Sequence, residues 1–390
     1  MNARRLIGLV MAALVVVGAA MWVSVRSGPE RVEGDQPVLV ALAESLDSVN
    51  QVRLSRGDGA ATTLQRRDNG WFVAQRDFPA DPGKLRSLMI QLSTLRAVEQ
   101  KTSDPAHYGA LNVEDAAGAQ SHSVRIDVAA GARTWSLLLG KAAEPSGGFV
   151  RVPGTATALL AQPRIEADPQ PTHWIKTELI DLAADRIQQV TVHPAAGPSY
   201  WIARDARGVA DLTLHGVPPG RKPAAPAVVD AVARTLRRLN AEDVKQRAPG
   251  ALEHPNRATF RTFEGLQLDV DGYREGASNW IRVNASVDQE TARRFAATVA
   301  AGEAKAPPAA KGETKSTEAP AVAQAKAPDP KSPDPKAPDA ASEAAAINSR
   351  LGSYDFQIPV YQYDALYRQL KELLAAPPEH TVTPGAKPPK

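Results

Sequence analysis

The sequence contains no cysteine and few aromatic residues, and each shortage excludes a class of structure. Without a thiol the chain cannot form disulfide bonds, thiolate metal sites, a cysteine nucleophile or a lipidated N-terminal cysteine. Aromatic residues make up 5% of the chain, which predicts largely aliphatic cores. The net charge of +3 is too small and too evenly spread to indicate nucleic-acid binding.

One stretch near the N-terminus lacks charge altogether. The 20 residues between Arg5 and Arg26 are uncharged and mostly apolar. A helix of that length would span about 30 Å, the thickness of the hydrocarbon core of a bilayer. We therefore expect residues 1–5 to form a cytoplasmic tail, 6–25 a transmembrane anchor and 26–40 a juxtamembrane linker. The short basic tail favours a single-pass protein of the inner membrane, with its N-terminus in the cytoplasm and its bulk in the periplasm.

A cleaved signal peptide is the alternative interpretation of this stretch. Gly18 and Ala20 would then be the small residues before the cut. The apolar run continues past Ala20 as far as Val25, however, and Trp22 stands where an interfacial aromatic residue is expected. Both features favour a retained anchor.

The rest of the chain contains an internal duplication. Asp47–Leu54 (DSVNQVRL) reappears as Asp185–Val192 (DRIQQVTV), and both segments have the alternation of a half-buried strand. Each copy then has a proline followed by apolar residues at helical spacing. These residues are Pro82, Leu85, Leu88, Leu92 and Leu95 in the first copy, and Pro226, Val229, Val232, Leu236 and Leu239 in the second. Chance similarity is the weaker explanation because the matches occur in the same order.

The copies also end alike, with Phe149–Val152 (FVRV) matching Trp280–Val283 (WIRV). The pattern predicts an α+β fold of internally duplicated β-β-α-β-β-type units with mainly antiparallel sheets, preceded by one transmembrane helix. We place repeat unit 1 at residues 41–182 and repeat unit 2 at residues 183–300.

Residues 301–345 differ in composition from the rest of the chain. Eight prolines stand among Ala, Lys and Asp, partly with a five-residue period, which predicts a disordered Pro/Ala/Lys-rich insert. Beyond it, Tyr354–Pro359 predicts a strand and Tyr363–Leu374 a helix. We assign residues 346–376 to a returning strand and helix of unit 2, and residues 377–390 to a disordered tail. A tether to a separate C-terminal hook is the alternative, but so short a segment cannot form its own core.

No pattern predicts a catalytic residue, a cofactor or a metal site. The histidines lack metal-ligand spacing; they are His107, His122, His173, His193, His215, His254 and His380. His107 and His254 occupy corresponding loops after the repeated helix, where loop-fixing hydrogen bonds are favoured over a ligand pair. The run Asp269-Val-Asp271-Gly272 lacks the closing residues of a calcium loop and predicts a strand ending in a turn. Gly140-Lys141 lacks the other residues of a phosphate loop.

Two further groups of residues could form binding sites. The aromatic residues are expected on strands and in cores, rather than in a stacking platform for sugars or bases. They are Trp71, Phe72, Trp135, Phe149, Trp174, Trp201 and Trp280. Arg151 and Arg282 are equivalent across the two copies. We expect these arginines to pair with carboxylates within the sheet, and an anion site is the alternative.

Several of these motifs together resemble a known family. They are the single span, Gly70–Val73 (GWFV), the helix ending at Leu95–Ala97, the LLLG ending at Gly140 with Phe149–Val152, and His173–Leu182. They are similar to an uncharacterised bacterial "domain of unknown function" family encoded beside gliding-motility-type ABC-2 transporters. The resemblance covers residues 5–375 apart from the proline-rich insert.

The resemblance implies a membrane-anchored periplasmic component. Its implied partners are an ABC-2 type permease, the ATPase of that permease and a second auxiliary membrane-anchored subunit. Because its motifs are structural, it assigns no catalytic residue. We therefore expect a non-enzymatic accessory protein of an export system. The alternatives are a periplasmic ligand-binding protein or hydrolase with a site between the repeat units, and a structural protein of the cell envelope.

Overall fold

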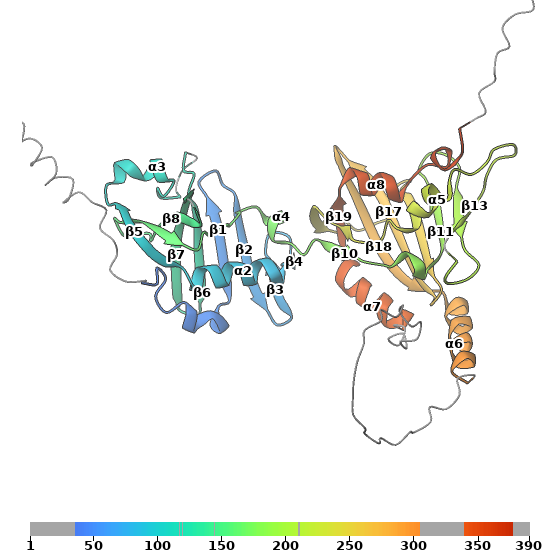
Figure 1. The fold of residues 1–390 in the computed structure, drawn as a ribbon, viewed down its shortest axis with the longest axis horizontal. Helices are drawn as coiled ribbons and strands as arrows, with labels where there is room; N and C mark the ends of the chain where they lie inside the picture. The colour runs from blue at the N-terminus through green and yellow to red at the C-terminus, as the bar shows by residue number, and fades with distance from the viewer. Residues whose placement is uncertain are drawn as a thin grey trace, which may run out of the picture. The chain divides into compact units, whose positions relative to one another are not determined.

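The computed structural model describes residues 36–116, 118, 120–143, 145–209, 211–304 and 339–376. The predicted cytoplasmic tail and anchor, most of the linker, the middle of the insert and the C-terminal tail lie outside these ranges. Within them, none of the helices has the length and apolar character needed to cross a membrane. The chain divides into two compact units, unit 1 up to Lys176 and unit 2 from Thr177 (Figure 1).

Unit 1 is built on one antiparallel sheet of nine strands in the order β4-β3-β2-β1-β6-β7-β8-β9-β5. The strands are β1 (Gln51–Arg56), β2 (Ala61–Arg67), β3 (Gly70–Val73), β4 (Phe78–Pro79), β5 (Arg96–Thr102), β6 (Val124–Ala130), β7 (Arg133–Ala143), β8 (Gly147–Arg151) and β9 (Ala158–Gln162). The helical segments are η1 (Ala43–Ser48), α2 (Pro82–Ser93), η2 (Pro105–His107), α3 (Tyr108–Leu111) and α4 (Pro171–Trp174).

Unit 2 has an antiparallel sheet of eight strands in the order β13-β12-β11-β16-β17-β18-β19-β15, and a small β10-β14 pair. The strands are β10 (Glu178–Ile180), β11 (Ile187–His193), β12 (Tyr200–Ala203), β13 (Thr213–His215), β14 (Leu239–Asn240), β15 (Asp243–Gln246), β16 (Asn256–Thr262), β17 (Leu266–Glu275), β18 (Ser278–Val287) and β19 (Tyr354–Ile358). The helical segments are η3 (Ala184–Arg186), α5 (Pro226–Ala233), α6 (Gln289–Ala304), α7 (Ala340–Leu351), α8 (Val360–Leu366) and η4 (Leu370–Leu373).

The two sheets have the same topology, which confirms the duplicated, mainly antiparallel α+β fold. Apart from the short edge strand β4, replacing each strand of unit 1 by its counterpart converts β3-β2-β1-β6-β7-β8-β9-β5 into β13-β12-β11-β16-β17-β18-β19-β15. The strands β5 and β15 were not expected. Both lie at a sheet edge, where one side of the strand stays exposed and the apolar alternation used to recognise strands is weak.

The repeated helices α2 and α5 begin where the prolines predict. Pro82 and Pro226 are the first residues of these helices, where a missing N–H costs no hydrogen bond. The Asp81 carboxylate caps α2 by accepting hydrogen bonds from the N–H groups of Gly83 and Lys84. Both helices end earlier than predicted: Leu95 lies between α2 and β5, Leu236 lies after α5, and Leu239 begins β14.

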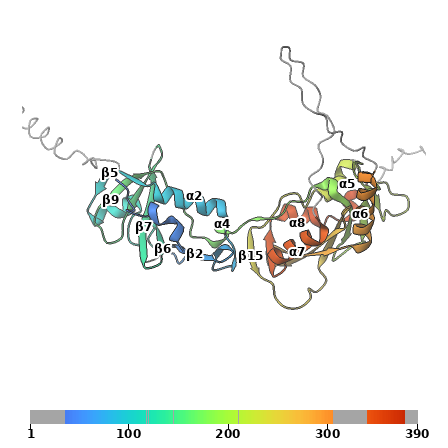
Figure 2. The ribbon, with the colours of Figure 1, turned by 90° about the horizontal axis from the view of Figure 1, so that it is seen from below.

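The helices that pack on each sheet lie mainly on one face, which we call the inner face. Figure 2 shows α2 on one side of the unit 1 sheet. In unit 2, α5 contacts β11, α7 contacts β17 and β18, and α8 contacts β18. The cores between these helices and sheets are mainly aliphatic, with fully buried residues such as Leu54, Leu88, Val190 and Val232.

The segment between β18 and β19 departs from the expected insert. In unit 1 the matching strands β8 and β9 are joined by a short turn, whereas in unit 2 the connection contains α6 and α7. Residues 340–345 belong to α7 because the Asp339 carboxylate caps its first turn and Ala344, Ile347 and Leu351 are buried along one face. The strand after the insert is β19, which pairs with both β18 and β15.

Three further expectations need correction. Trp174 lies in α4 rather than on a strand. The helix expected over Tyr363–Leu374 is divided into α8, which starts at Val360 after Pro359, and the short 3-10 turn η4. The boundary between the units falls before the predicted one at Leu182, because β10 pairs with β14 of unit 2.

Candidate functional site

Arg151 and Arg282 occupy the same place in the two sheets. Leu138 of β7 is paired with Arg151 of β8, and Asp271 of β17 is paired with Arg282 of β18. Both arginines are buried, at 4% and 9% relative exposure. Arg151 donates to one carbonyl group of the loop that joins β5 to β6, and Arg282 donates to two carbonyl groups of the loop that joins β15 to β16.

In both units the guanidinium fixes this loop. The Arg151 Nε lies 2.8 Å from the Val113 carbonyl oxygen, and the Arg282 Nη1 lies 2.9 Å from the Gly250 carbonyl oxygen. A second Arg282 nitrogen, Nη2, donates to the Ala248 carbonyl at 3.3 Å. A buried guanidinium has five donors to satisfy, and the loop carbonyls supply part of that requirement.

Both arginines also pair with carboxylates, as expected, but only one does so within the sheet. Arg282 makes a two-pronged contact with Asp355 of β19, with Nε–Oδ1 at 2.8 Å and Nη2–Oδ2 at 3.2 Å. Arg151 contacts Asp115 at 2.6 Å, and Asp115 belongs to the loop. Within the sheet, β9 offers Ala158 at the position of Asp355, so Arg151 has no carboxylate there.

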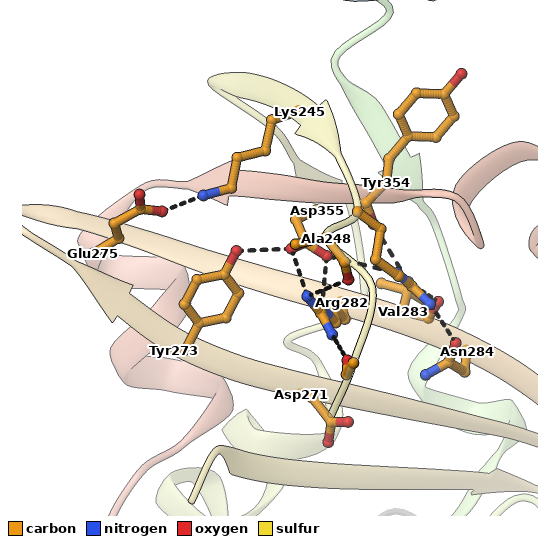
Figure 3. A network of polar contacts seen from close by, with 12 residues as sticks. Lys245, Ala248, Asp271, Tyr273, Glu275, Arg282, Val283, Asn284, Tyr354 and Asp355 are labelled. Atoms are coloured by element: carbon orange, nitrogen blue, oxygen red, sulfur yellow. Dashed lines mark hydrogen bonds and ion pairs between the residues drawn. The ribbon is translucent and has the colours of Figure 1, made fainter. Parts of the chain in front are cut away.

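Asp355 is the centre of a polar network (Figure 3). Its side chain is 1% exposed and accepts a hydrogen bond from the Tyr273 hydroxyl at 2.8 Å as well as those from Arg282. The Arg247 Nε lies 3.6 Å from the same carboxylate. Burial, followed by the bond to Asp355, raises the pKa of the Tyr273 hydroxyl, so Tyr273 stays a hydrogen-bond donor at neutral pH.

Arg247 adds a second guanidinium to this network. Its Nη1 donates to the Asn284 side-chain oxygen at 2.9 Å, and its Nη2 donates to the Val283 and Tyr354 carbonyls. Burial lowers the pKa of Arg247, and the nearby charge of Arg282 acts in the same direction. Two guanidiniums therefore face the one buried carboxylate of Asp355, which leaves this place with excess positive charge.

These residues continue a line of alternating charge across the outer face of the unit 2 sheet. Cross-strand pairing places the residues of this charged row side by side on β16, β17, β18, β19 and β15. The charged row consists of Arg257, Asp271, Arg282, Asp355 and Lys245. Opposite charges directly across neighbouring strands stabilise a sheet.

The ends of the charged row are more exposed than its middle. Arg257 contacts Asp271 with Nε–Oδ1 at 2.6 Å, and these hydrogen bonds raise the pKa of Arg257. At the other end the Lys245 ammonium lies 4.0 Å from the centre of the Trp280 ring and pairs with Glu275. The equivalent row in unit 1 lacks the acids, since it reads Arg125, Leu138, Arg151, Ala158 and Thr102.

A cavity of about 510 Å³ lies beside the charged row. Its lining includes His193, Arg247, Leu252, Arg257, Arg282 and Asn284. The guanidiniums of three arginines line this cavity, and the two carboxylates of Asp271 and Asp355 lie next to them. The three positive charges outnumber the two negative charges, so the local charge is positive. Such a surface attracts carboxylate or phosphate groups.

The histidines of the described residues take part in local contacts. The His107 Nδ1 lies 3.3 Å from the Asp104 carboxylate in its own loop, and the His193 Nδ1 lies 2.8 Å from the Ser199 hydroxyl. His215 stacks on Trp201, and His254 lines a cavity of unit 2 with a left-handed backbone. His380 lies outside the described residues. Within the described part of the chain, no cluster of three or more His, Asp or Glu residues could hold a metal ion.

The two glycine-containing motifs are parts of strands. Asp269–Gly272 lies in the middle of β17, which continues to Glu275, so the expected turn at Gly272 is wrong. Gly272 is instead needed because a Cβ there would collide with the Tyr367 ring. Gly140 lies in β7, where a Cβ would collide with the Leu111 carbonyl. Both glycines thus permit close packing against a strand.

Of the seven aromatic residues expected on strands, all except Trp174 are on strands, and most are partly or fully buried. Trp201 is the exception in exposure, at 42%, and its ring lies parallel to the His215 ring with centres 5.1 Å apart.

Three residues of the polar network, Asp355, Tyr273 and Arg247, were not predicted from the sequence. An acid between apolar neighbours in Tyr354–Ile358 was the available signal, but its partner could not be named without the strand register.

Comparisons with known proteins identify one region. Residues 71–256 match a family described as "Domain of unknown function (DUF4340)". The chain contains a DUF4340 domain. Its matched span runs from β3 of unit 1 to the start of β16 of unit 2, so the DUF4340 match includes the loops held by Arg151 and Arg282 but stops before Arg282 itself. No curated protein and no solved structure matches the chain.

Proposed function

We propose that this protein is a non-enzymatic, membrane-anchored accessory subunit of an ABC-2 type export system. Residues 6–25 anchor it in the inner membrane, and units 1 and 2 lie in the periplasm. The uncharged run of 20 residues ahead of two β-sheet units is the observation that carries this proposal. Its partners are the permease, its ATPase and a second anchored subunit, as the family resemblance implies.

The outer face of unit 2 supports a role in protein contacts. The charged row crosses five strands and is held in place by the Arg282–Asp355 pair. The adjacent cavity carries three guanidiniums and has a net positive charge. A fixed, charged sheet face selects a partner by electrostatic complementarity, and an acidic partner surface fits this one.

Affinity purification of the full chain from detergent-solubilised membranes tests the proposal. We expect the permease, the ATPase and the second auxiliary subunit to co-purify with it. A variant with residues 6–25 replaced by an unrelated apolar helix serves as the control for contacts within the membrane. A preparation that yields none of the transporter subunits from the unmodified chain contradicts the proposal.

A further inference from the structure

The loop beside the repeated arginine carries an acid in unit 1. This loop spans residues 103–123, between β5 and β6. The Arg151 Nε donates to the Val113 carbonyl at 2.8 Å, and the carboxylate of Asp115, two residues further on, lies 2.6 Å from the Arg151 Nη2. In unit 1 the chain itself therefore brings a carboxylate to the guanidinium.

The matching loop of unit 2 is shorter and brings no carboxylate to this place. It spans residues 247–255, between β15 and β16. Its Gly250 carbonyl accepts a hydrogen bond from Arg282, and the residue two positions further on is Leu252. Leu252 lines the cavity of about 510 Å³ beside the charged row, which we call the arginine cavity. The one acid of the loop, Glu253, lines another cavity of unit 2 instead.

Two arginines that line the arginine cavity have N–H groups to spare. The Arg257 Nε and Nη2 both donate to Asp271, which leaves the Arg257 Nη1 without a partner in the described part of the chain. The Arg257 side chain is 50% exposed, so a ligand can reach this nitrogen. The Arg247 Nε is buried and makes no hydrogen bond within the same residues, since the nearest carboxylate oxygen, on Asp355, lies 3.6 Å away.

The charge of the arginine cavity fits a ligand with one negative charge. Its three guanidiniums exceed the neighbouring carboxylates of Asp271 and Asp355 by one positive charge. A carboxylate balances that charge, and its two oxygens match the planar fork of a guanidinium. A phosphate monoester carries up to two negative charges and would leave the cavity negative. The apolar part of the lining, which includes Leu252 and Pro255, suits the methylene groups of an acidic side chain.

We propose that the arginine cavity binds the carboxylate of an Asp or Glu side chain from a partner protein. The carboxylate pairs with the Arg257 guanidinium, and the methylene groups next to it contact Leu252. The partner thereby supplies to unit 2 what Asp115 supplies to unit 1 within the chain. This inference rests on the proposed function, because it names the group by which an accessory subunit would recognise its partner.

A peptide that carries the acid of unit 1 provides the direct test. The probe is a fluorescent peptide of residues 111–116, which contains Glu114 and Asp115. We expect saturable binding to the full chain in detergent, followed by fluorescence anisotropy. The same peptide with Glu114→Gln and Asp115→Asn keeps its shape but loses its carboxylates, and it should not bind. Absence of saturable binding, or equal binding of the two peptides, contradicts the proposal.

A pair of arginine variants separates the cavity from general electrostatic attraction. Arg257→Gln should weaken binding of the probe about tenfold, because it removes a charged donor to the ligand. Arg261→Gln makes the same change on the same strand, but Arg261 is exposed and does not line the cavity, so binding should be unchanged. Equal affinities of the two variants overturn the proposal.

A second pair of variants fills the cavity from within. Leu252→Asp places a carboxylate of the chain at the position that corresponds to Asp115, so it should abolish binding of the probe while every arginine remains. Leu252→Asn has nearly the same size and no charge, and it should keep most of the affinity. Equal loss of binding in these two variants would show that the shape of the loop, and not its charge, controls the site, which overturns the proposal.

A photo-crosslinking residue at Ala251, which is exposed and lines the cavity, identifies the natural occupant in cells. A crosslink to a protein segment that is lost when one Asp or Glu of that segment becomes the amide supports the proposal. Crosslinks only to lipid, crosslinks that do not depend on an acid, or no crosslinked protein contradict it.

The proposed function is tested separately by co-purification. If the probe binds and the acid-dependent crosslink leads to a protein outside the transporter, the cavity inference stands and the ABC-2 assignment fails. If the transporter subunits co-purify but the amide peptide binds as well as the acidic one, the ABC-2 assignment stands and the cavity inference fails.

Discussion

Arg151 and Arg282 perform the same structural task in surroundings of opposite character. In unit 1 the guanidinium lies 4.5 Å from the centre of the Tyr108 ring, and α3 with Val113 and Ala158 covers it with apolar side chains. In unit 2 the guanidinium lies within the charged row and shares Asp355 with Tyr273. In both units the guanidinium donates hydrogen bonds to loop carbonyls. The groups that balance its positive charge differ between the two units.

The difference extends to the position of the balancing acid. Asp115, the partner of Arg151, is 75% exposed on its side chain, so water solvates it with or without the arginine. Asp355 is 1% exposed and its closest cation is Arg282, at 2.8 Å, whereas the Arg247 Nε lies 3.6 Å away. A buried charge left without its partner carries the full desolvation penalty. Unit 2 should therefore be more sensitive than unit 1 to loss of the repeated arginine.

Arg282→Met should produce the largest effect. Removing one partner of a buried ion pair costs about 3–5 kcal/mol, and we expect the lower part of this range because Arg247 and Tyr273 still contact the buried Asp355. Arg151→Met should cost about 1–2 kcal/mol, since it mainly removes hydrogen bonds to the loop carbonyls and leaves a solvated acid. Hydrogen exchange of β18 and β8 in the full chain reports the two opening free energies separately.

A second substitution tests whether the buried carboxylate is the cause. Asp355→Leu added to Arg282→Met removes the stranded charge and should recover a large part of the lost stability. Equal destabilisation by Arg151→Met and Arg282→Met would show that the loop contacts, and not the charge balance, dominate in both units. That result would remove the contrast drawn between them.

Gly272→Ala should have an intermediate effect on unit 2. The added Cβ collides with the ring of Tyr367, a buried residue directly after α8, so this end of α8 must shift away from β17. Overpacking of this kind costs about 1–3 kcal/mol. Gly148→Ala is the matched control in unit 1, since a Cβ there makes only ordinary van der Waals contacts. Chemical denaturation of both variants gives the comparison, and similar midpoints would mean that α8 does not fill its site tightly.

The sequence predicted those features that depend on local pattern. The two copies of the strand-helix pattern, the proline starts of α2 and α5, and the equivalence of Arg151 and Arg282 all follow from spacing along the chain. Asp355 could not be assigned as the partner of Arg282 because 72 residues of sequence, including the insert, separate the two. Their contact depends on strand register, which a single sequence does not reveal when pairing is this distant.

Another failure has an equally local cause. The start of α7 was hidden because its alanines resemble the insert in composition, and only the cap at Asp339 and the spacing of Ile347 and Leu351 mark a helix.

Arg257→Gln, at the exposed end of the charged row, should have the smallest effect. The Arg257 side chain is 50% exposed, and an exposed ion pair contributes only about 0.2–1 kcal/mol even with good geometry. Added salt should reduce the difference further, because screening weakens exposed pairs more than buried ones. Arg125→Gln is the matched change in unit 1, where Arg125 pairs with Asp127 of its own strand. Hydrogen exchange of β16 and β6 at low and high salt measures the stability that each substitution removes from its unit.

If Arg257→Gln costs as much stability as Arg282→Met and the loss does not depend on salt, the five residues of the charged row act as one cooperative network. A small, salt-sensitive loss means instead that the Arg282–Asp355 pair alone holds the face together and the ends of the row are free to meet a partner.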